Sequence, residues 1–205
     1  MQTIAHPSDP GQAAEAVAAA LEAGGVAVIP TDTVYGLAGL PARPEAVQRI
    51  FELKQRPLER RLPVIVAAAE GLGALGIELG PAGERVAAAF WPGALTIVAG
   101  VREPAVEWLQ GRDEVGVRVP AAPVAIRLAE LVGPFLMTSA NMHGGGTRST
   151  LAEVLADLAG EPDVAVDGGE LSIVSSTLVN VNLAEPAIER EGAVPSEIVM
   201  AALRG

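Results

Sequence analysis

No property of the sequence restricts its fold more than the alternation of two kinds of apolar segment. Short runs rich in Val and Ile, such as "VAVIP" (26–30) and "LPVIVA" (62–67), are typical of buried strands. Longer segments in which Ala, Leu and Val recur at helical spacing, such as 13–25 and 123–133, lie between such runs. Strands that alternate with helices predict a layered α/β domain.

The rest of the chain follows the same pattern. Helices are expected at 43–55, 83–91, 150–160 and 196–204, and strands at 94–100, 114–120, 135–140, 163–167, 174–181 and 187–190. Ser8 or Asp9 is placed to cap the first helix, and Gly24 stands where a left-handed residue would end it. The sequence contains no repeat and no linker-like stretch, so we expect a single domain over 1–205 with a core at about 10–195.

The amino-acid composition excludes several classes of functional site. Half of the 205 residues are hydrophobic but only 3% are aromatic, so Ala, Val, Leu and Ile must form the core. The absence of cysteine excludes disulfides, thiolate metal sites and a cysteine nucleophile, and fits a cytoplasmic protein. We expect neither a signal peptide nor a membrane span. A net charge of -11 argues against broad, charge-driven binding to nucleic acid, but it allows a local basic pocket.

The stretch "KQRPLERR" (54–61) concentrates positive charge in this acidic chain, and it contains the only lysine, Lys54. Cations at a helix C-terminus are favoured in any case, which is one explanation. The other is an anion site, since Arg56 offers a planar fork and Lys54 a compact charge. If the helix ends near Gln55, both side chains can turn toward one ligand.

Two further stretches follow predicted strands and are rich in hydrogen-bonding groups. "PTDTVYGL" (30–37) carries hydroxyls beside Asp32, and "TSANMHGGGTR" (138–148) combines Ser, Asn and Thr with glycines. Ligands of α/β sheets gather outside strand ends, although ordinary turns use the same residue types. The second stretch matches neither a phosphate-binding P-loop nor the G-x-S-x-G turn that carries a nucleophilic serine.

Three isolated residues complete the candidates. Arg118 lies in the apolar strand "VGVRVP" and needs an anion or solvent, because an unpaired buried charge is costly. His6 and His143 have no partner at metal-ligand spacing, so a zinc site is not expected.

Taken in order, seven segments resemble the Sua5/YciO/YrdC family. They are "PTDTVYGL" (30–37), "K-x-R-P" (54–57), "FWPGALT" (90–96), "VGVRVP" (115–120), "TSAN" (138–141), "SST" (175–177) and "REGA" (190–193). The resemblance implies a YrdC-type three-layer α/β fold, in which helices flank a strongly twisted mixed sheet with a concave ligand-binding face.

The resemblance also implies an enzyme, a nucleotidyltransferase that acts as an L-threonylcarbamoyladenylate synthase. Such an enzyme converts L-threonine, bicarbonate and ATP into threonylcarbamoyl-AMP and diphosphate, for N6-threonylcarbamoyladenosine modification at position 37 of tRNA. A transferase that modifies tRNA is then the expected recipient of the product, and direct tRNA binding is expected to be weak or absent. The reaction joins two anions, so it needs cations that lower their repulsion.

The roles that the resemblance implies fall on three groups of residues. Catalysis is assigned to Lys54 and Arg56; ATP binding to Arg56, Arg60, Ser139, Asn141, Thr147 and Arg190; and threonine binding to Thr33, Arg118 and Ser176. Mg²⁺ is the expected cofactor, bound through the ATP phosphates rather than by a cage of protein ligands.

The chain departs from the family pattern at three places. Arg61 replaces a usual proline, His143-Gly144 replaces a common Ser-Gly pair, and Glu191 replaces the proline of "RPG". These departures leave open a YciO-like paralogue that binds RNA or carbamoylates another acceptor. The length of the chain points to the short, YrdC-like form.

Overall fold

The computed structural model describes residues 1–5, 9–58 and 61–204. Its helices are α1 (Pro10–Glu22), α2 (Pro44–Lys54), α3 (Gly80–Phe90), α4 (Pro123–Val132), α5 (Leu151–Asp157) and α6 (Ser196–Arg204), with short 3₁₀ turns at Ala69–Gly71, Gly73–Leu75 and Glu107–Leu109. Its strands are β1 (Gln2–Ala5), β2 (Ala27–Ile29), β3 (Gly36–Gly39), β4 (Val64–Ile65), β5 (Ile77–Glu78), β6 (Leu95–Val101), β7 (Glu114–Arg118), β8 (Phe135–Ser139), β9 (Val164–Asp167), β10 (Thr177–Asn180) and β11 (Ala187–Arg190).

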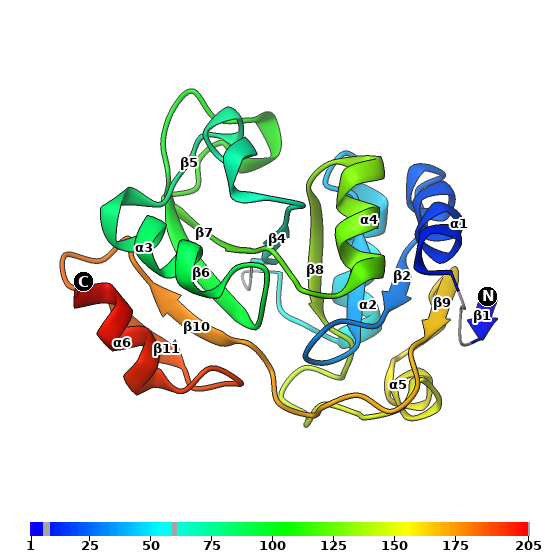
Figure 1. Ribbon diagram of the computed structural model, residues 1–205. Helices are drawn as coiled ribbons and strands as arrows, with labels where there is room; N and C mark the ends of the chain where they lie inside the picture. Colours follow the sequence, from blue (N-terminus) through cyan, green and yellow to red (C-terminus); the bar gives the residue numbers. More distant parts are fainter. Residues whose placement is uncertain (6–8, 59–60, 205) are drawn as a thin grey trace.

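The strands join in one mixed sheet. Within the described residues, the order is β1-β9-β2-β3-β8-β4-β7-β6-β10-β11, and β5 adds to the edge of β6. The pairs β1–β9, β2–β9, β4–β7 and β6–β10 are parallel, and the others are antiparallel. Figure 1 shows β10 running at a steep angle to β8, so the sheet is strongly twisted. The predicted α/β fold with a twisted mixed sheet is confirmed.

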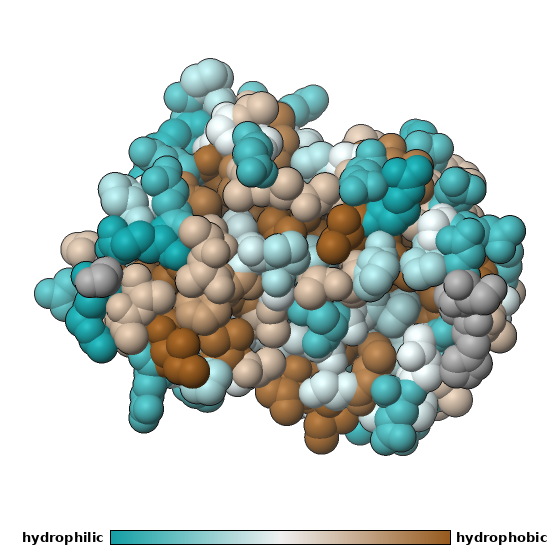
Figure 2. All heavy atoms as spheres, in the orientation of Figure 1, coloured by the Kyte–Doolittle hydropathy of each residue, from teal (hydrophilic) through white to brown (hydrophobic). Residues whose placement is uncertain are grey.

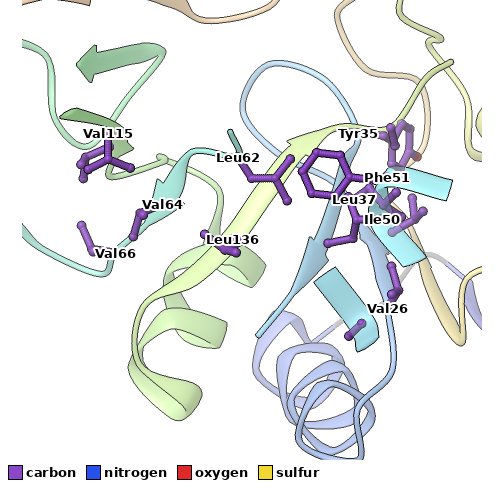
Figure 3. Close-up of a cluster of buried hydrophobic side chains, with 14 of the residues drawn as sticks. Val26, Tyr35, Leu37, Ile50, Phe51, Leu62, Val64, Val66, Val115 and Leu136 are labelled. Atoms are coloured by element: carbon purple, nitrogen blue, oxygen red, sulfur yellow. The ribbon is translucent and has the colours of Figure 1, made fainter. Parts of the chain in front are cut away.

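Helices pack on both faces of the sheet. Because side chains of a strand alternate between faces, neighbours in β8 belong to different cores. Phe135 and Met137 pack with α1 and α4, whereas Leu136 packs on the other face with residues of α2. Figure 3 shows Leu136, Leu37 and Ile50 in this second core. A third cluster joins α3 and α6 to β6 and β10.

α1 and α4 cover one face of the sheet, but only over half of its strands. On the same face, the other half of the sheet carries polar groups. The described apolar cluster of α1 and α4 uses β2, β3, β8, β9 and one residue of β4, with no member from β6, β7 or β10. In β7, Val115 and Val117 point into the core, so Gly116 and Arg118 point to this face. The uncovered half therefore forms the floor of a cavity.

Several helix ends lie where capping and terminating residues of the sequence predicted them. Asp9 caps α1 by accepting hydrogen bonds from the N–H groups of Gly11 and Gln12, and Gly24 follows the helix at φ 88°. α2 ends at Lys54 because Gln55 adopts a left-handed conformation at φ 48°.

Other boundaries differ from the prediction. α1 starts three residues earlier than expected, at Pro10, and α5 ends at Asp157 because Leu158 is extended. The strands β1, β3 and β5 were not predicted; β3 reads "GLAG", and glycine at both ends hides its strand character.

Hydrophilic and apolar residues share the face in Figure 2, with hydrophilic residues mainly toward its edges. One group of apolar residues lies at the lower edge, where the segment between β9 and β10 passes in Figure 1. Among the described helices, none combines the length and the apolar character needed to cross a membrane.

Candidate functional site

A cavity of about 740 Å³ opens on the uncovered half of the sheet. Its floor comes from β6 and β7, and its walls come from the ends of β3 and β8 and from the chain before β4 and β10. Among the described residues, four arginines line it, namely Arg56, Arg61, Arg118 and Arg190, against two acidic residues, Asp113 and Glu114. A cavity lined by this set of side chains attracts anions.

Arg118, at the end of β7, anchors one part of the cavity. The residue is 5% exposed. Its Nη2 lies 2.8 Å from the Asp32 carboxylate, its Nη1 donates to the Thr33 hydroxyl at 3.0 Å, and its Nε donates to the Gly93 carbonyl at 2.9 Å. Burial lowers the pKa of Arg118, and the charge of Asp32 opposes this shift. These contacts use three of the five guanidinium donors, so a bound carboxylate can take the others.

The Thr33 hydroxyl is held in turn by the loop before β3. It lies 3.0 Å from the hydroxyl of Thr31, which donates to the Val34 carbonyl at 2.6 Å. Thr31 also accepts the N–H groups of Thr33 and Val34. Thr33 and Arg118, each predicted to bind threonine, are therefore hydrogen-bonded to each other in the cavity wall.

Ser176 and Arg190 form the neighbouring part of the wall. The Ser176 hydroxyl lies 2.7 Å from that of Thr96 on β6, and Arg190 Nη2 donates to it at 3.2 Å. Arg190 also donates twice to the Ser176 carbonyl, at 2.9 and 3.1 Å. Burial, with a smaller contribution from the charge of Arg118, lowers the pKa of Arg190. Arg190, which the sequence assigned to ATP, thus lies beside the residues assigned to threonine.

Arg56 and Arg61 border another part of the cavity. Arg56 follows the left-handed Gln55, which turns the chain away from α2, and its Nη2 donates to the Arg61 carbonyl at 3.2 Å. The prediction for Arg60 lies outside the described residues.

The side chain of Lys54 points away from the cavity that Arg56 lines, although the sequence predicted that both residues act at one site. Its side chain is 2% exposed and is absent from the cavity lining. The ammonium group donates to the backbone carbonyls of Ser139 and Asn141, and its pKa falls to about 8 through burial and the charge of Arg56, which Asp157 partly offsets. Lys54 therefore does not turn toward the cavity beside Arg56, because α2 packs its side chain against the end of β8.

Lys54 and Asp157 hold the loop that follows β8. The Lys54 carbonyl accepts the His143 N–H at 2.8 Å, and Asp157 accepts the Met142 N–H at 2.9 Å. Arg148 pairs with Asp157 at 2.8 Å. The loop that carries several predicted ATP contacts is therefore fixed from two sides.

Three residues of the segment 138–148 were predicted to bind ATP. Of these, only Ser139 lines the cavity. The Asn141 amide donates to the carbonyls of Met142 and Gly145, and its Oδ1 is buried with no partner among the described residues. Thr147 donates to the Ile173 carbonyl. Asn141 and Thr147 thus shape the loop in this conformation and lie outside the cavity lining.

Family membership rests on the whole chain rather than on the cavity alone. The Sua5_yciO_yrdC family model, described as "Telomere recombination", matches residues 19–192. The chain belongs to this family. The family assignment made from seven sequence segments is confirmed.

Relatives in the family carry consistent names. A threonylcarbamoyl-AMP synthase of Pyrococcus abyssi is 37% identical over 177 residues, which cover 85% of this chain and 52% of that protein. A putative threonylcarbamoyl-AMP synthase of Mycobacterium tuberculosis H37Rv is 31% identical over 196 residues, covering 93% and 90%. The chain therefore spans about half the length of the first relative and nearly all of the second.

Solved structures of the family share the fold. The crystal structure of P. abyssi Sua5 complexed with L-threonine superposes with a TM-score of 0.87 at 32% identity, covering 98% of this chain and 60% of that one. Escherichia coli YciO superposes with a TM-score of 0.81, and its 24% identity supports the fold alone.

The three departures from the family pattern have separate structural settings. Glu191 accepts hydrogen bonds from the N–H and hydroxyl of Ser196, the first residue of α6, and lies outside the cavity lining. His143 and Arg61 are exposed and line the cavity. Glu191 is thus a helix cap, and Arg61 is the departure that adds charge to the site.

Sequence reasoning missed two residues that organise the cavity. Asp32 was noted without a role, yet it neutralises Arg118 across 86 positions of sequence. Thr96 is a hydroxyl in the otherwise apolar strand "LTIVAGV", between core residues Leu95 and Ile97. Its place in that alternation is a signal that could have identified it as facing the cavity.

Proposed function

We propose that this chain is an L-threonylcarbamoyladenylate synthase that uses L-threonine, bicarbonate and ATP. The observation that carries the proposal is the buried Arg118 held by Asp32 and Thr33, in the same cavity as Arg56 and Arg61. The reaction needs an amino-acid carboxylate and a triphosphate held together, so separated cations in one cavity suit it.

The amino acid is proposed to bind at Arg118. The unused donors of Arg118 would pair with the threonine carboxylate, next to the hydroxyls of Thr33 and Ser176. The P. abyssi structure described as complexed with L-threonine supports this ligand. Arg190, bound to Ser176, would raise the positive potential at the same place.

The nucleotide is proposed to lie toward Arg56 and Ser139. The threonine ammonium group combines with bicarbonate to form a carbamate and water, with loss of one proton. A carbamate oxygen then attacks the α-phosphorus, the bond to the β-phosphate bridging oxygen breaks, and diphosphate leaves. The protein's share is to position the two anions and to stabilise the charge that grows on diphosphate.

Mg²⁺ is proposed to arrive with the nucleotide. Among the described residues, no three His, Asp or Glu side chains form a group able to hold a metal ion. Asp113 and Glu114 line the cavity and offer the carboxylate oxygens that Mg²⁺ accepts beside phosphate oxygens. The ion would add positive charge at the phosphates.

The test is incubation with ATP, L-threonine and bicarbonate, followed by detection of threonylcarbamoyl-AMP and diphosphate. We expect diphosphate release that depends on threonine. ATP turnover that does not depend on threonine would point to another acceptor. Tight tRNA binding with a steep salt dependence and no turnover would point to an RNA-binding paralogue.

A further inference from the structure

The segment between β9 and β10, residues 168–176, runs from the end of β9 to the cavity wall and is called the strap below. Its first residue, Gly168, donates its N–H to the Tyr35 hydroxyl at 3.0 Å. Its last two residues, Ser175 and Ser176, line the cavity. Figure 1 shows the strap passing the loop that precedes α5. The strap therefore carries part of the cavity wall, and its course decides where that part lies.

The end of the strap is held firmly by the segment after β11. The Ser175 carbonyl accepts the Ala193 N–H at 2.9 Å, and Arg190 donates twice to the Ser176 carbonyl. Gly192 approaches so closely that a Cβ atom there would lie 2.4 Å from the carbonyl carbon of Ser176. This side of the strap cannot shift without moving β11.

The middle of the strap depends on hydrogen bonds rather than on packing. Ile173 and Val174 are 61% and 47% exposed, so their side chains bury little apolar surface. The Thr147 hydroxyl donates to the Ile173 carbonyl, and the Leu171 N–H donates to the Ser149 carbonyl at 2.8 Å. Both of these contacts come from the loop that precedes α5. Thr147 thus supplies a side-chain tether where packing supplies little.

We propose that Thr147 is a positioning residue for the amino-acid substrate. By holding the Ile173 carbonyl, it keeps the strap where Ser175 and Ser176 face the ligand, at most ~11 Å further along the chain. A strap that sampled other positions would bind threonine more weakly, because only the molecules with an assembled wall are competent. The proposal rests on the proposed function, since it concerns that threonine site. It gives Thr147 a role on the threonine side, whereas the sequence assigned it to ATP.

The test is a calorimetric titration of L-threonine, without nucleotide, into the wild type, Thr147→Val and Thr147→Ser. Valine keeps the shape of threonine and removes the hydroxyl, whereas serine keeps the hydroxyl. We expect Thr147→Val to weaken threonine binding about threefold to tenfold and Thr147→Ser to restore it. The matched control is Thr3→Val, at an exposed position of the edge strand β1 outside the cavity lining, which should bind as the wild type does.

Hydrogen exchange shows whether the strap itself has loosened. In Thr147→Val, the amides of 171–176 should exchange faster than in the wild type. The melting temperature should fall by no more than about 4 °C, because one hydrogen bond of a half-buried side chain is lost.

Three results would overturn the positioning role of Thr147. They are wild-type threonine affinity in Thr147→Val, which a residue that contacts only the nucleotide would give, a loss of affinity that Thr147→Ser does not restore, and strap amides that exchange no faster. A wild-type protein that binds no threonine would instead refute the proposed function. The exchange measurement needs neither threonine nor turnover, so the two failures are distinguishable.

Discussion

Replacing Lys54 by methionine should damage both the fold and the activity. Methionine keeps the length of the side chain but removes the donor for the Ser139 and Asn141 carbonyls, which lie at the end of β8. Each buried carbonyl that loses its partner costs about 1–3 kcal/mol, and removing a buried charge returns part of this. A net loss of about 3 kcal/mol follows, which corresponds to a fall of about 6–12 °C in melting temperature for a chain of this size.

The activity of Lys54→Met should fall at least about 100-fold, because the end of β8, which carries Ser139, loses its support. Urea unfolding followed by circular dichroism measures the first effect, and threonine-dependent adenylate formation measures the second. Arg56→Ala is the matched control: Arg56 lines the cavity and is half-buried, so its loss should reduce activity with a change in stability below about 1 kcal/mol. A Lys54→Met protein as stable as Arg56→Ala would refute the positioning role.

Two further predictions concern the buried Lys54, and two concern Arg118 and Glu191. Lysine-selective ¹³C labelling should give a single side-chain signal with a titration midpoint of about 8; a midpoint near 10.5 would contradict the burial of Lys54. Since this folded pKa lies below the unfolded one, the stability contribution of Lys54 should rise between pH 8 and 10.5. Arg118→Lys should raise KM for threonine about tenfold or more and change KM for ATP little, in steady-state kinetics; an equal rise in both would disprove a threonine-specific role. Glu191→Ala should leave activity unchanged, and above pH 5 it should lower the melting temperature by a small amount. The hydrogen bonds from Ser196 lower the pKa of Glu191, so at acid pH, where the carboxylate becomes protonated, this difference in melting temperature should vanish. Lost activity would place Glu191 in the site.

Much of the fold was accessible from sequence because local patterns specify it. The strand and helix alternation, Asp9 as a cap and Gly24 as a terminator are all local signals, and each agrees with the structure. Strand β3 was not predicted, because "GLAG" has no strand propensity of its own and forms a strand only by pairing with β2 and β8.

The site was less accessible because its contacts are long-range. Lys54 and Arg56 are two positions apart, yet the left-handed Gln55 sends one into the protein and leaves the other on the cavity. The Asp32–Arg118 ion pair depends on where β7 lies relative to the loop before β3. Residue types alone predict neither the directions of these two side chains nor the Asp32–Arg118 contact.

The central claim is that this cavity joins threonine, bicarbonate and ATP. The most direct measurement is mass spectrometry of the reaction with ¹³C-bicarbonate, L-threonine, ATP and Mg²⁺. We predict a threonylcarbamoyl-AMP product that carries the label, forms only when threonine is present, and is lost in Arg56→Ala. An unlabelled adenylate, or equal diphosphate release without threonine, would contradict the account.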